Sequence, residues 1–136
     1  MRRSPMLVVK YPCKLGIISH VWLYLCRKSI FNYRRMYIFN TTYHVDDVLK
    51  DDFIAWLRDT YIPAATARPE LHRPQLCRVL TGEETEGESY SLQFHVADNA
   101  CLETWYTAVG AELDMAIQER YGERVIGFNT LLEVLE

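Results

Sequence analysis

The chain has 136 residues, which is enough for one domain with a modest hydrophobic core. Apolar residues make up 49% of it and aromatic residues 12%, so most of the chain is expected to be folded rather than disordered. The formal net charge is −3, and no motif fixes a reaction, because the chain lacks a P-loop, a G-x-G-x-x-G sequence and cysteine pairs at metal-ligand spacing. We therefore expect no cofactor and no metal.

The charge is divided unevenly between residues 1–35 and residues 36–136. The first segment holds eight Lys and Arg and no acidic residue, whereas the second holds all eighteen Asp and Glu against the remaining seven Lys and Arg. The formal charges are therefore +8 and −11. A domain this acidic is a poor general ligand for nucleic acid or anionic lipid, so we expect no nucleic-acid partner.

Residues 15–26, LGIISHVWLYLC, form an apolar run flanked by positive charge. Twelve residues are too few for a membrane span, which needs about 20, and Arg27 and Lys28 follow where a signal peptide would have small residues. A basic apolar helix on a membrane surface stays open. The lack of acidic residues favours instead a start codon assigned too early, with Met36 as the natural first residue. We treat residues 1–35 as an N-terminal extension and residues 36–136 as the domain, and we expect membrane contact only if the extension is real.

The domain opens with residues 36–45, MYIFNTTYHV, whose β-branched and aromatic residues are typical of a strand. Alternation places Phe39 and Thr41 on one face and Asn40 and His44 on the other. Asp46 or Asp47 can cap a following helix, whose apolar stripe runs to about Tyr61. Pro63 is expected to end that helix, because the residue before a proline avoids helical angles.

The middle of the domain is predicted to be a β-hairpin. Residues 64–74 contain two prolines and are expected to be a loop. A strand over 75–81, QLCRVLT, is followed by an acidic turn over 82–87, which we interpret as solvated because it lacks EF-hand spacing. Residues 89–96, SYSLQFHV, alternate strictly and predict the antiparallel partner strand.

The last third is predicted to be a helix and a strand. Asp98 or Asn99 can cap a helix ending near Tyr121, and Gly122 stands where a helix end requires a residue with positive φ. Residues 124–135, RVIGFNTLLEVL, form the final strand. The order strand, helix, strand, strand, helix, strand predicts an α+β fold, the ferredoxin-like βαββαβ pattern with a four-stranded antiparallel sheet and two helices on one face. The first and last strands carry apolar residues on both faces. This predicts an open sheet face that a second copy covers in a homodimer.

The segments YIFNTTYHVDD, LCRVLTGEETEGESYSLQFHV and RYGERVIGF, together with the helix that holds Trp56, resemble a small bacterial family known only as domain of unknown function 4286. That family is similar in fold to the dimeric α+β barrel proteins. The resemblance covers residues 36–136 and leaves residues 1–35 unmatched. It implies the fold and a homodimer, and it implies no established activity.

Proteins of similar fold include small monooxygenases and haem-degrading enzymes, whose ligand cleft lies between helices and sheet. By this resemblance Asn40 is a candidate for the floor of such a cleft, with local hydrogen bonding as the plainer interpretation. His44 and His95 can act as a pair if the first and third strands are neighbours, although solvated edge histidines are the simpler hypothesis. Trp56 can stack on a cofactor or pack in the core.

We therefore expect a small cytoplasmic homodimer that is a binding or interaction module rather than an enzyme. One alternative is a small-molecule enzyme of the dimeric α+β barrel monooxygenase type that uses the helix–sheet cleft. Another is a membrane-peripheral protein attached through residues 1–35. An open cleft with convergent polar groups would favour the small-molecule alternative, and a filled interior would favour the module.

Overall fold

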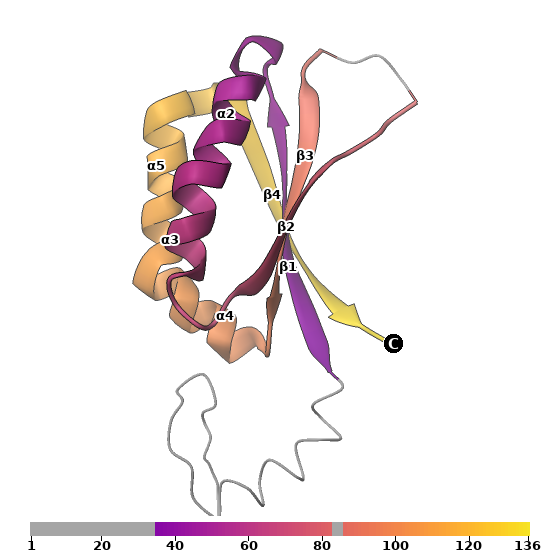
Figure 1. The fold of residues 1–136 in the computed structure, drawn as a ribbon, viewed down its shortest axis with the longest axis vertical. Helices are drawn as coiled ribbons and strands as arrows, with labels where there is room; N and C mark the ends of the chain where they lie inside the picture. The colour runs from indigo at the N-terminus through magenta and orange to yellow at the C-terminus, as the bar shows by residue number, and fades with distance from the viewer. Residues whose placement is uncertain (1–34, 83–85) are drawn as a thin grey trace, which may run out of the picture. The chain divides into compact units, whose positions relative to one another are not determined.

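The computed structural model describes residues 35–82 and 86–136, and residues 37–132 form one compact unit (Figure 1). Except for Arg35, the predicted extension 1–35 lies outside the described residues, and so do its interpretations as an early start or a membrane arm. The elements are, in chain order, β1 (Met36–Val45), η2 (Asp47–Leu49), α2 (Lys50–Trp56), η3 (Leu57–Tyr61), α3 (Ile62–Thr66), β2 (His72–Arg78), β3 (Glu88–Val96), α4 (Asn99–Trp105), η4 (Tyr106–Gly110), α5 (Ala111–Tyr121), η5 (Gly122–Arg124) and β4 (Val125–Val134).

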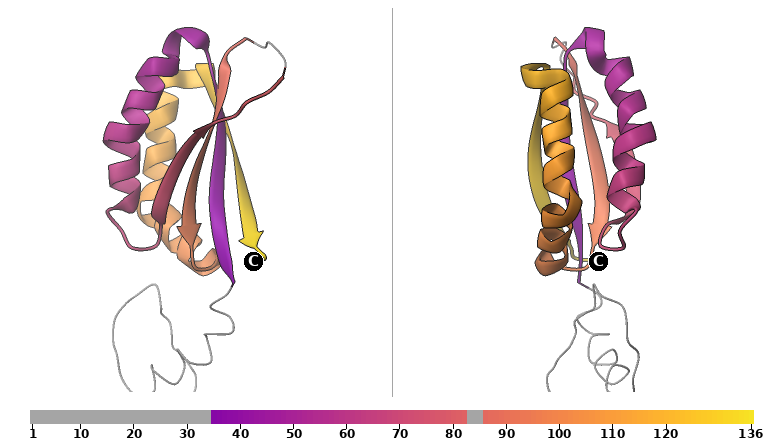
Figure 2. Two further views of the ribbon diagram at one scale, coloured as in Figure 1. Left: turned by 45° about the vertical axis from the view of Figure 1, so that its right-hand side comes forward. Right: turned by 90° about the vertical axis from the view of Figure 1, so that its left-hand side faces the viewer.

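The four strands form one antiparallel sheet in the order β2-β3-β1-β4. β1 pairs with β3 so that Phe39 lies opposite Phe94 and Thr41 opposite Leu92. The two helical segments, α2 to α3 and α4 to α5, both pack on the same face of the sheet (Figure 2). This confirms the predicted ferredoxin-like α+β fold. No helix among the described residues covers the other face, which we call the open sheet face.

The hydrophobic core fills the space between the helices and the sheet. Odd-numbered residues of β1 and even-numbered residues of β3 point into it, as the strand period of two requires. Trp105 is almost fully buried and its indole N–H donates a hydrogen bond to the carbonyl of Ala65 at 3.0 Å, which links the two helical segments. The largest fully buried side chains are Trp105, Tyr61, Phe53, Phe94, Leu57, Leu71 and Leu92.

Each helical segment contains a π-helical turn, η3 in the first and η4 in the second. The N–H of Ile62 donates to the carbonyl of Leu57, five residues earlier, and this widens the helix directly before Pro63. The prediction that Pro63 ends the helix was wrong, since α3 continues to Thr66. A widened turn gives the proline ring the room that a regular α-helix denies it.

The loop prediction for residues 64–74 was also wrong at both ends, because α3 runs to Thr66 and β2 begins at His72. β2 carries an irregularity between His72 and Gln75, where Arg73 has a φ of 54°. Such a bulge lets a strand tolerate Pro74, which cannot donate to the ladder. The second strand also ends at Arg78, three residues before the predicted end at Thr81, and the remaining predicted boundaries hold within a residue or two.

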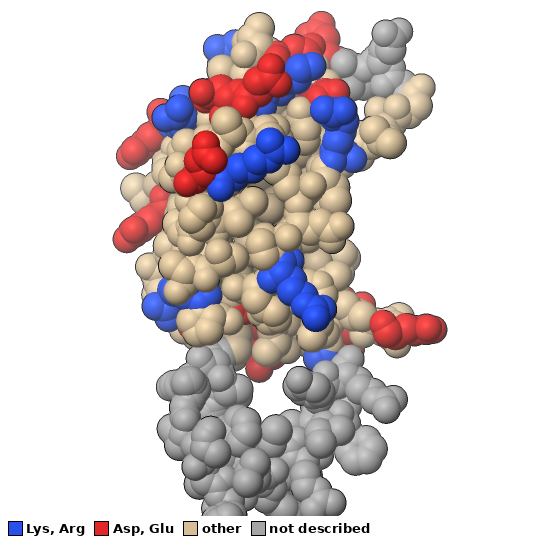
Figure 3. Space-filling view, viewed as in Figure 1, with Lys and Arg blue, Asp and Glu red and all other residues tan. Residues whose placement is uncertain are grey.

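Both caps predicted for the second helix are present. The side chain of Asp98 accepts a hydrogen bond from the N–H of Cys101 at 2.8 Å, and Gly122 has a φ of 60° at the end of α5. Charged side chains gather around the end of the domain at which α2 begins, while the middle of the same view is largely uncharged (Figure 3). Within the described residues, no helix has the length and apolar character to cross a membrane.

Candidate functional site

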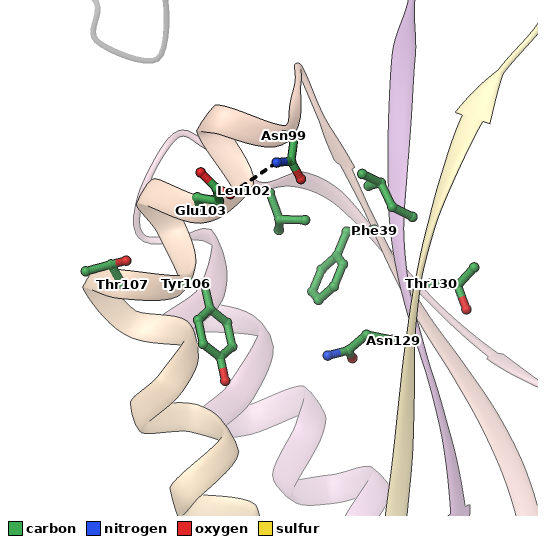
Figure 4. Close-up of a pocket in the computed structure, with 9 residues that line it drawn as sticks. Phe39, Asn99, Leu102, Glu103, Tyr106, Thr107, Asn129 and Thr130 are labelled. Carbon is green, nitrogen blue, oxygen red and sulfur yellow. Dashed lines mark hydrogen bonds between the residues drawn. The ribbon is translucent and has the colours of Figure 1, made fainter.

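A cleft of about 560 Å³ opens between the second helical segment and strands β1 and β4 (Figure 4). Its volume falls in the range of small-molecule sites. All of its lining residues belong to the compact unit 37–132. We call it the helix–sheet cleft, and it is lined by Phe39, Asn99, Leu102, Glu103, Tyr106, Thr107, Asn129, Thr130 and Leu131.

Local sequence features position the residues that line the helical side of the cleft. The Asp98 cap fixes the first turn of α4, and the helical period then brings Leu102 and Tyr106 to the same side. Tyr106 begins the π-helical turn η4, which also brings Thr107 to the cleft. Gly110 ends that turn against the Trp105 ring, where a Cβ atom would lie 2.5 Å from Cζ3. Gly110 leaves room for the rings of both Trp105 and Tyr106, because a Cβ atom would also lie 2.8 Å from Cδ2 of Tyr106.

Alternation along β4 places the sheet side of the cleft. Gly127 faces the helices, since a Cβ atom there would lie 3.0 Å from the Tyr43 ring. Asn129 and Leu131 follow at intervals of two and line the cleft with Phe39 of β1. β4 lies at the edge of the sheet, so these side chains remain exposed. The glycine leaves room for the Tyr43 ring of β1.

Asn129 is held by a residue of the neighbouring strand. The hydroxyl of Thr41 donates a hydrogen bond to Oδ1 of Asn129 at 2.9 Å, and Thr41 is itself buried. This bond fixes the amide with its nitrogen pointing into the cleft, as Figure 4 shows. Asn129 therefore presents an N–H donor to the cleft that the rings of Phe39 and Tyr106 also line.

A carboxylate lies beyond the inner end of Tyr106. The Tyr106 hydroxyl donates to Oδ2 of Asp114 at 2.9 Å. Partial burial raises the pKa of Asp114, and the hydrogen bond from Tyr106 opposes that rise. The same hydrogen bond is the main cause that raises the pKa of Tyr106, followed by the charge of Asp114. Tyr106 therefore stays a neutral donor at ordinary pH.

Two buried tyrosines lie deeper in the core. Burial raises the pKa of Tyr43 to about 12, with Asp114 adding to the rise and the hydroxyls of Tyr61 and Thr41 opposing it. Burial also raises the pKa of Tyr61, to which Tyr43 contributes. Within the part of the chain that the structure describes, the Tyr43 hydroxyl has no hydrogen-bond partner of acceptable geometry.

Asn40 lies on the open sheet face and does not line the helix–sheet cleft. Its amide oxygen accepts a hydrogen bond from the hydroxyl of Ser91, and its amide nitrogen donates to Oγ1 of Thr42 at 3.1 Å. Gln93 extends this polar row by donating to Oγ of Ser91 at 3.2 Å. The local hydrogen bonding considered for Asn40 is thus present, and its role toward a ligand stays a prediction.

The structure does not bring His44 and His95 together. His95 lies opposite Ile38, whereas His44 lies opposite Ser89 at the other end of the paired strands. The two ring nitrogens of His44 contact Oγ of Ser89 at 3.0 Å and the carbonyl oxygen of Glu86 at 2.9 Å, so this histidine joins β3 to the turn before it.

His95 instead lies beside His72, with ring centroids 6.0 Å apart. Sequence reasoning placed His72 in a loop and missed this pair, because β2 begins earlier than its pattern indicated. Burial lowers the pKa of His72, with His95 and Arg73 adding to the effect. Among the described residues no group of three or more His, Cys, Asp or Glu side chains is placed to hold a metal ion.

Trp56 is half-buried between the helical segments. Its ring contacts Tyr61 and Tyr121, each with centroids 6.1 Å apart in edge-on geometry. This is the packing role that its position in the apolar stripe indicated, and its cofactor role stays a prediction.

The helix–sheet cleft contains none of the four residues that sequence reasoning proposed. Its polar centre, Asn129 with Thr41, joins two strands that are 88 positions apart in sequence. The alternation of the last strand could have indicated that Asn129 and Gly127 share a face. It could not have indicated that this face turns toward the helices.

The fold and the cleft together define the protein as a ferredoxin-like α+β domain with an open cleft between its helices and its sheet. The chain belongs to the family DUF4286, a domain of unknown function whose model matches residues 36–135. No curated protein matches the sequence.

Several solved structures share the fold. A protein of the ethyl tert-butyl ether d (ethd) family from Bacillus halodurans C-125 is similar over 74% of this chain and 98% of its own, with a TM-score of 0.54 and 14% identity. A Bacillus cereus protein provisionally described as an antibiotic biosynthesis monooxygenase is similar over 74% and 94%, with a TM-score of 0.51 and 11% identity. A dimeric ferredoxin-like protein from an uncultured marine organism matches over 75% and 96%, at 0.47 and 14%. Identities this low show a shared fold alone.

Proposed function

We propose that this protein is a cytoplasmic homodimer that binds a small molecule in the helix–sheet cleft. The observation that carries the proposal is the cleft itself, which combines apolar walls with a donor that a buried threonine holds in place. A closed interior filled by side chains would have favoured a module that only contacts other proteins. The cleft has the size, apolar lining and few oriented polar groups that small-molecule sites have in general.

Binding rather than catalysis is the activity that we propose. None of the nine lining residues is a Ser, Cys, His or Lys, the side chains that most often supply a nucleophile or a base. Glu103, the one ionisable carboxylate in the lining, accepts a hydrogen bond from Asn99 at 3.2 Å and is exposed. A protein of similar fold is described as a monooxygenase, and this similarity adds no reacting group to this chain.

The experiment for the cleft compares ligand binding in wild type and in a variant whose cleft is filled. Leu131→Trp places a large ring among the lining residues, while Val48→Trp, at a position 77% exposed and outside the cleft, is the matched control. A thermal-shift screen of small molecules should find compounds that stabilise wild type and Val48→Trp but leave Leu131→Trp unchanged. Equal stabilisation of all three proteins would place binding elsewhere and refute the proposal.

The homodimer is supported by the open sheet face. Ile126 and Phe128 of β4 are 51% and 64% exposed, and Leu132 follows on the same face. The polar row around Asn40 makes its hydrogen bonds within the sheet, so a second copy can cover it without leaving amide groups unpaired. An exposed apolar strip beside such a row is typical of a surface that another copy of the chain buries.

Light scattering at low micromolar concentration tests the dimer. Wild type should have twice the mass of one chain, and Phe128→Glu should have the monomer mass, because a charge would enter the apolar strip. Met115→Glu, at an exposed position of α5, is the control and should leave the dimer intact. A monomeric wild type would contradict the open-face prediction.

A further inference from the structure

We infer that the ligand of the helix–sheet cleft is an uncharged cyclic molecule that carries a hydrogen-bond acceptor such as a carbonyl group, and that Asn129 receives this acceptor. The inference rests on the proposed function of the cleft. It adds the chemical class of the ligand and the residue that selects it.

The charges around the cleft argue against an anionic ligand. The lining contains no Lys, Arg or His. Its one carboxylate is Glu103, and the carboxylate of Asp114 lies behind Tyr106 at 2.9 Å from the hydroxyl. An anion would lose its hydration and meet two carboxylates without a compensating cation, which is unfavourable. The charge of −11 on residues 36–136 acts in the same direction.

A cationic ligand would meet an unfavourable donor group in the cleft. Its centre presents the N–H group of Asn129, which is a donor and faces a cation unfavourably. The carboxylate of Asp114 already accepts the Tyr106 hydroxyl and is not among the residues that line the cleft, so it is not presented to a ligand there. Glu103 is exposed and accepts from Asn99, so solvent screens its attraction.

An uncharged ligand with a hydrogen-bond acceptor matches the groups that line the cleft. The Asn129 oxygen is occupied by Thr41, so the amide nitrogen is the end of the side chain that is available to a ligand. Phe39 and Tyr106 supply ring surfaces on the side of β4 from which Asn129 projects (Figure 4), and Leu102 and Leu131 add apolar lining. Flat aromatic rings pack best against other flat rings. A cyclic ligand with a carbonyl group can therefore bury its body among these side chains and direct its oxygen to the Asn129 nitrogen.

Thr41 is a positioning residue in this arrangement. It is buried on β1, and its hydroxyl determines which end of the Asn129 amide points into the cleft. Asn129→Asp tests the donor that this hydrogen bond orients. An aspartate keeps an oxygen that accepts from Thr41 and replaces the N–H₂ donor by a second acceptor of the same shape. The substitution therefore changes the hydrogen-bonding character of the cleft with little change in its shape.

The experiment uses four small probes that share one ring and differ in one group: acetophenone, ethylbenzene, 1-phenylethylamine and benzoate. The full chain labelled with ¹⁵N is titrated with each, and binding is followed through the backbone amides of Thr107, Asn129 and Thr130. Wild type should bind acetophenone most tightly. Asn129→Asp should weaken acetophenone about 5- to 30-fold, the effect expected for loss of one hydrogen bond, while ethylbenzene binding stays unchanged and 1-phenylethylamine binds more tightly than before.

Thr104→Val is the control, because Thr104 is an exposed threonine of α4 beside Glu103 that does not line the cleft. It should leave the affinity for acetophenone within about twofold of wild type. If the cleft amides respond but benzoate or the amine binds wild type best, or Asn129→Asp leaves acetophenone unaffected, the ligand class is wrong and the cleft remains a binding site. If none of the four probes moves these amides up to its solubility limit, the proposed function fails together with the inference.

Discussion

Replacing Gly110 by alanine should destabilise the protein, although the same change in an ordinary helix stabilises it. Alanine in place of glycine usually gains about 0.5–1 kcal/mol in a helix. Here the new Cβ atom would lie 2.5 Å from Cζ3 and 2.9 Å from Cε3 of Trp105, and 2.8 Å from Cδ2 of Tyr106. Trp105 is 1% exposed and tied to Ala65 through its indole N–H, so it has no free direction in which to move.

The expected size follows from these two opposing effects. Forcing an additional carbon into a packed core costs about 1–3 kcal/mol, and the gain in helix propensity offsets part of this. We expect a net loss of about 1–2 kcal/mol in the free energy of unfolding, or roughly 5–15 °C in Tm for a domain of this size. Urea denaturation followed by tryptophan fluorescence measures it. Gly82→Ala is the control, since a Cβ atom added there would meet no atom within 4 Å, and it should leave the midpoint unchanged or slightly higher.

A double variant tests whether the Trp105 ring is the cause. Trp105→Phe removes the ring atoms Cε3 and Cζ3, so Gly110→Ala should cost clearly less in that background than in wild type. If Gly110→Ala is as stable as wild type, or if its cost is the same with Phe at position 105, the proposed steric conflict is wrong. Contact with the Trp105 ring would then not be the reason that position 110 requires a glycine.

Three further changes test the buried hydroxyls and the histidine pair. In urea denaturation, Tyr43→Phe should leave the free energy of unfolding unchanged or slightly higher, because no hydrogen bond is lost. Tyr121→Phe should lower it by about 1 kcal/mol, because the Tyr121 hydroxyl donates a hydrogen bond to Asp52 at 2.7 Å. Between pH 10 and about 12 the unfolded chain loses the Tyr43 proton while the folded protein keeps it, so stability should fall as the pH rises and should fall less steeply in Tyr43→Phe; equal slopes would contradict the raised pKa. The lowered pKa of His72 means that the unfolded chain takes up its proton first as the pH falls below 6.5, so the contribution of His72 is present above that pH and lost below it. An NMR titration of the His72 ring that gives a pKa at or above 6.5 would refute this.

The sequence predicted most of the framework because the signals for it are local. Strict alternation over residues 88–96 and the Asp98 cap depend on neighbours a few positions away, and the structure has both. The same locality explains two errors. Pro63 continues the helix because the π turn before it widens the backbone, and no residue type announces such a turn. β2 begins at His72 because the bulge at Arg73 absorbs the proline that follows.

The candidate site was harder to predict because it depends on which face of the first strand meets the helices. Both faces of β1 carry a mixture of aromatic and polar residues, so alternation could not decide between Asn40 and Thr41. In the structure Thr41 points toward the helices, and this places its hydroxyl next to Asn129 on the neighbouring strand β4. The pair of His72 and His95 was missed for a related reason, since the register of β2 against β3 is a tertiary property.

The two asparagines on adjacent strands show how a structural amide differs from one that is available to a ligand. Asn40 has both ends of its amide engaged, by Ser91 and by Thr42, so its hydrogen bonds belong to the sheet and a second copy can cover it at little cost. Asn129 has only its oxygen engaged among the described residues, by a threonine that is itself buried. The fold orients this N–H donor in an open cleft beside two aromatic rings and leaves it without an acceptor among the described residues. Covering the donor costs free energy unless the covering molecule accepts a hydrogen bond. A second chain can therefore cover the sheet face that holds Asn40. The face that holds Asn129 suits a ligand with a hydrogen-bond acceptor.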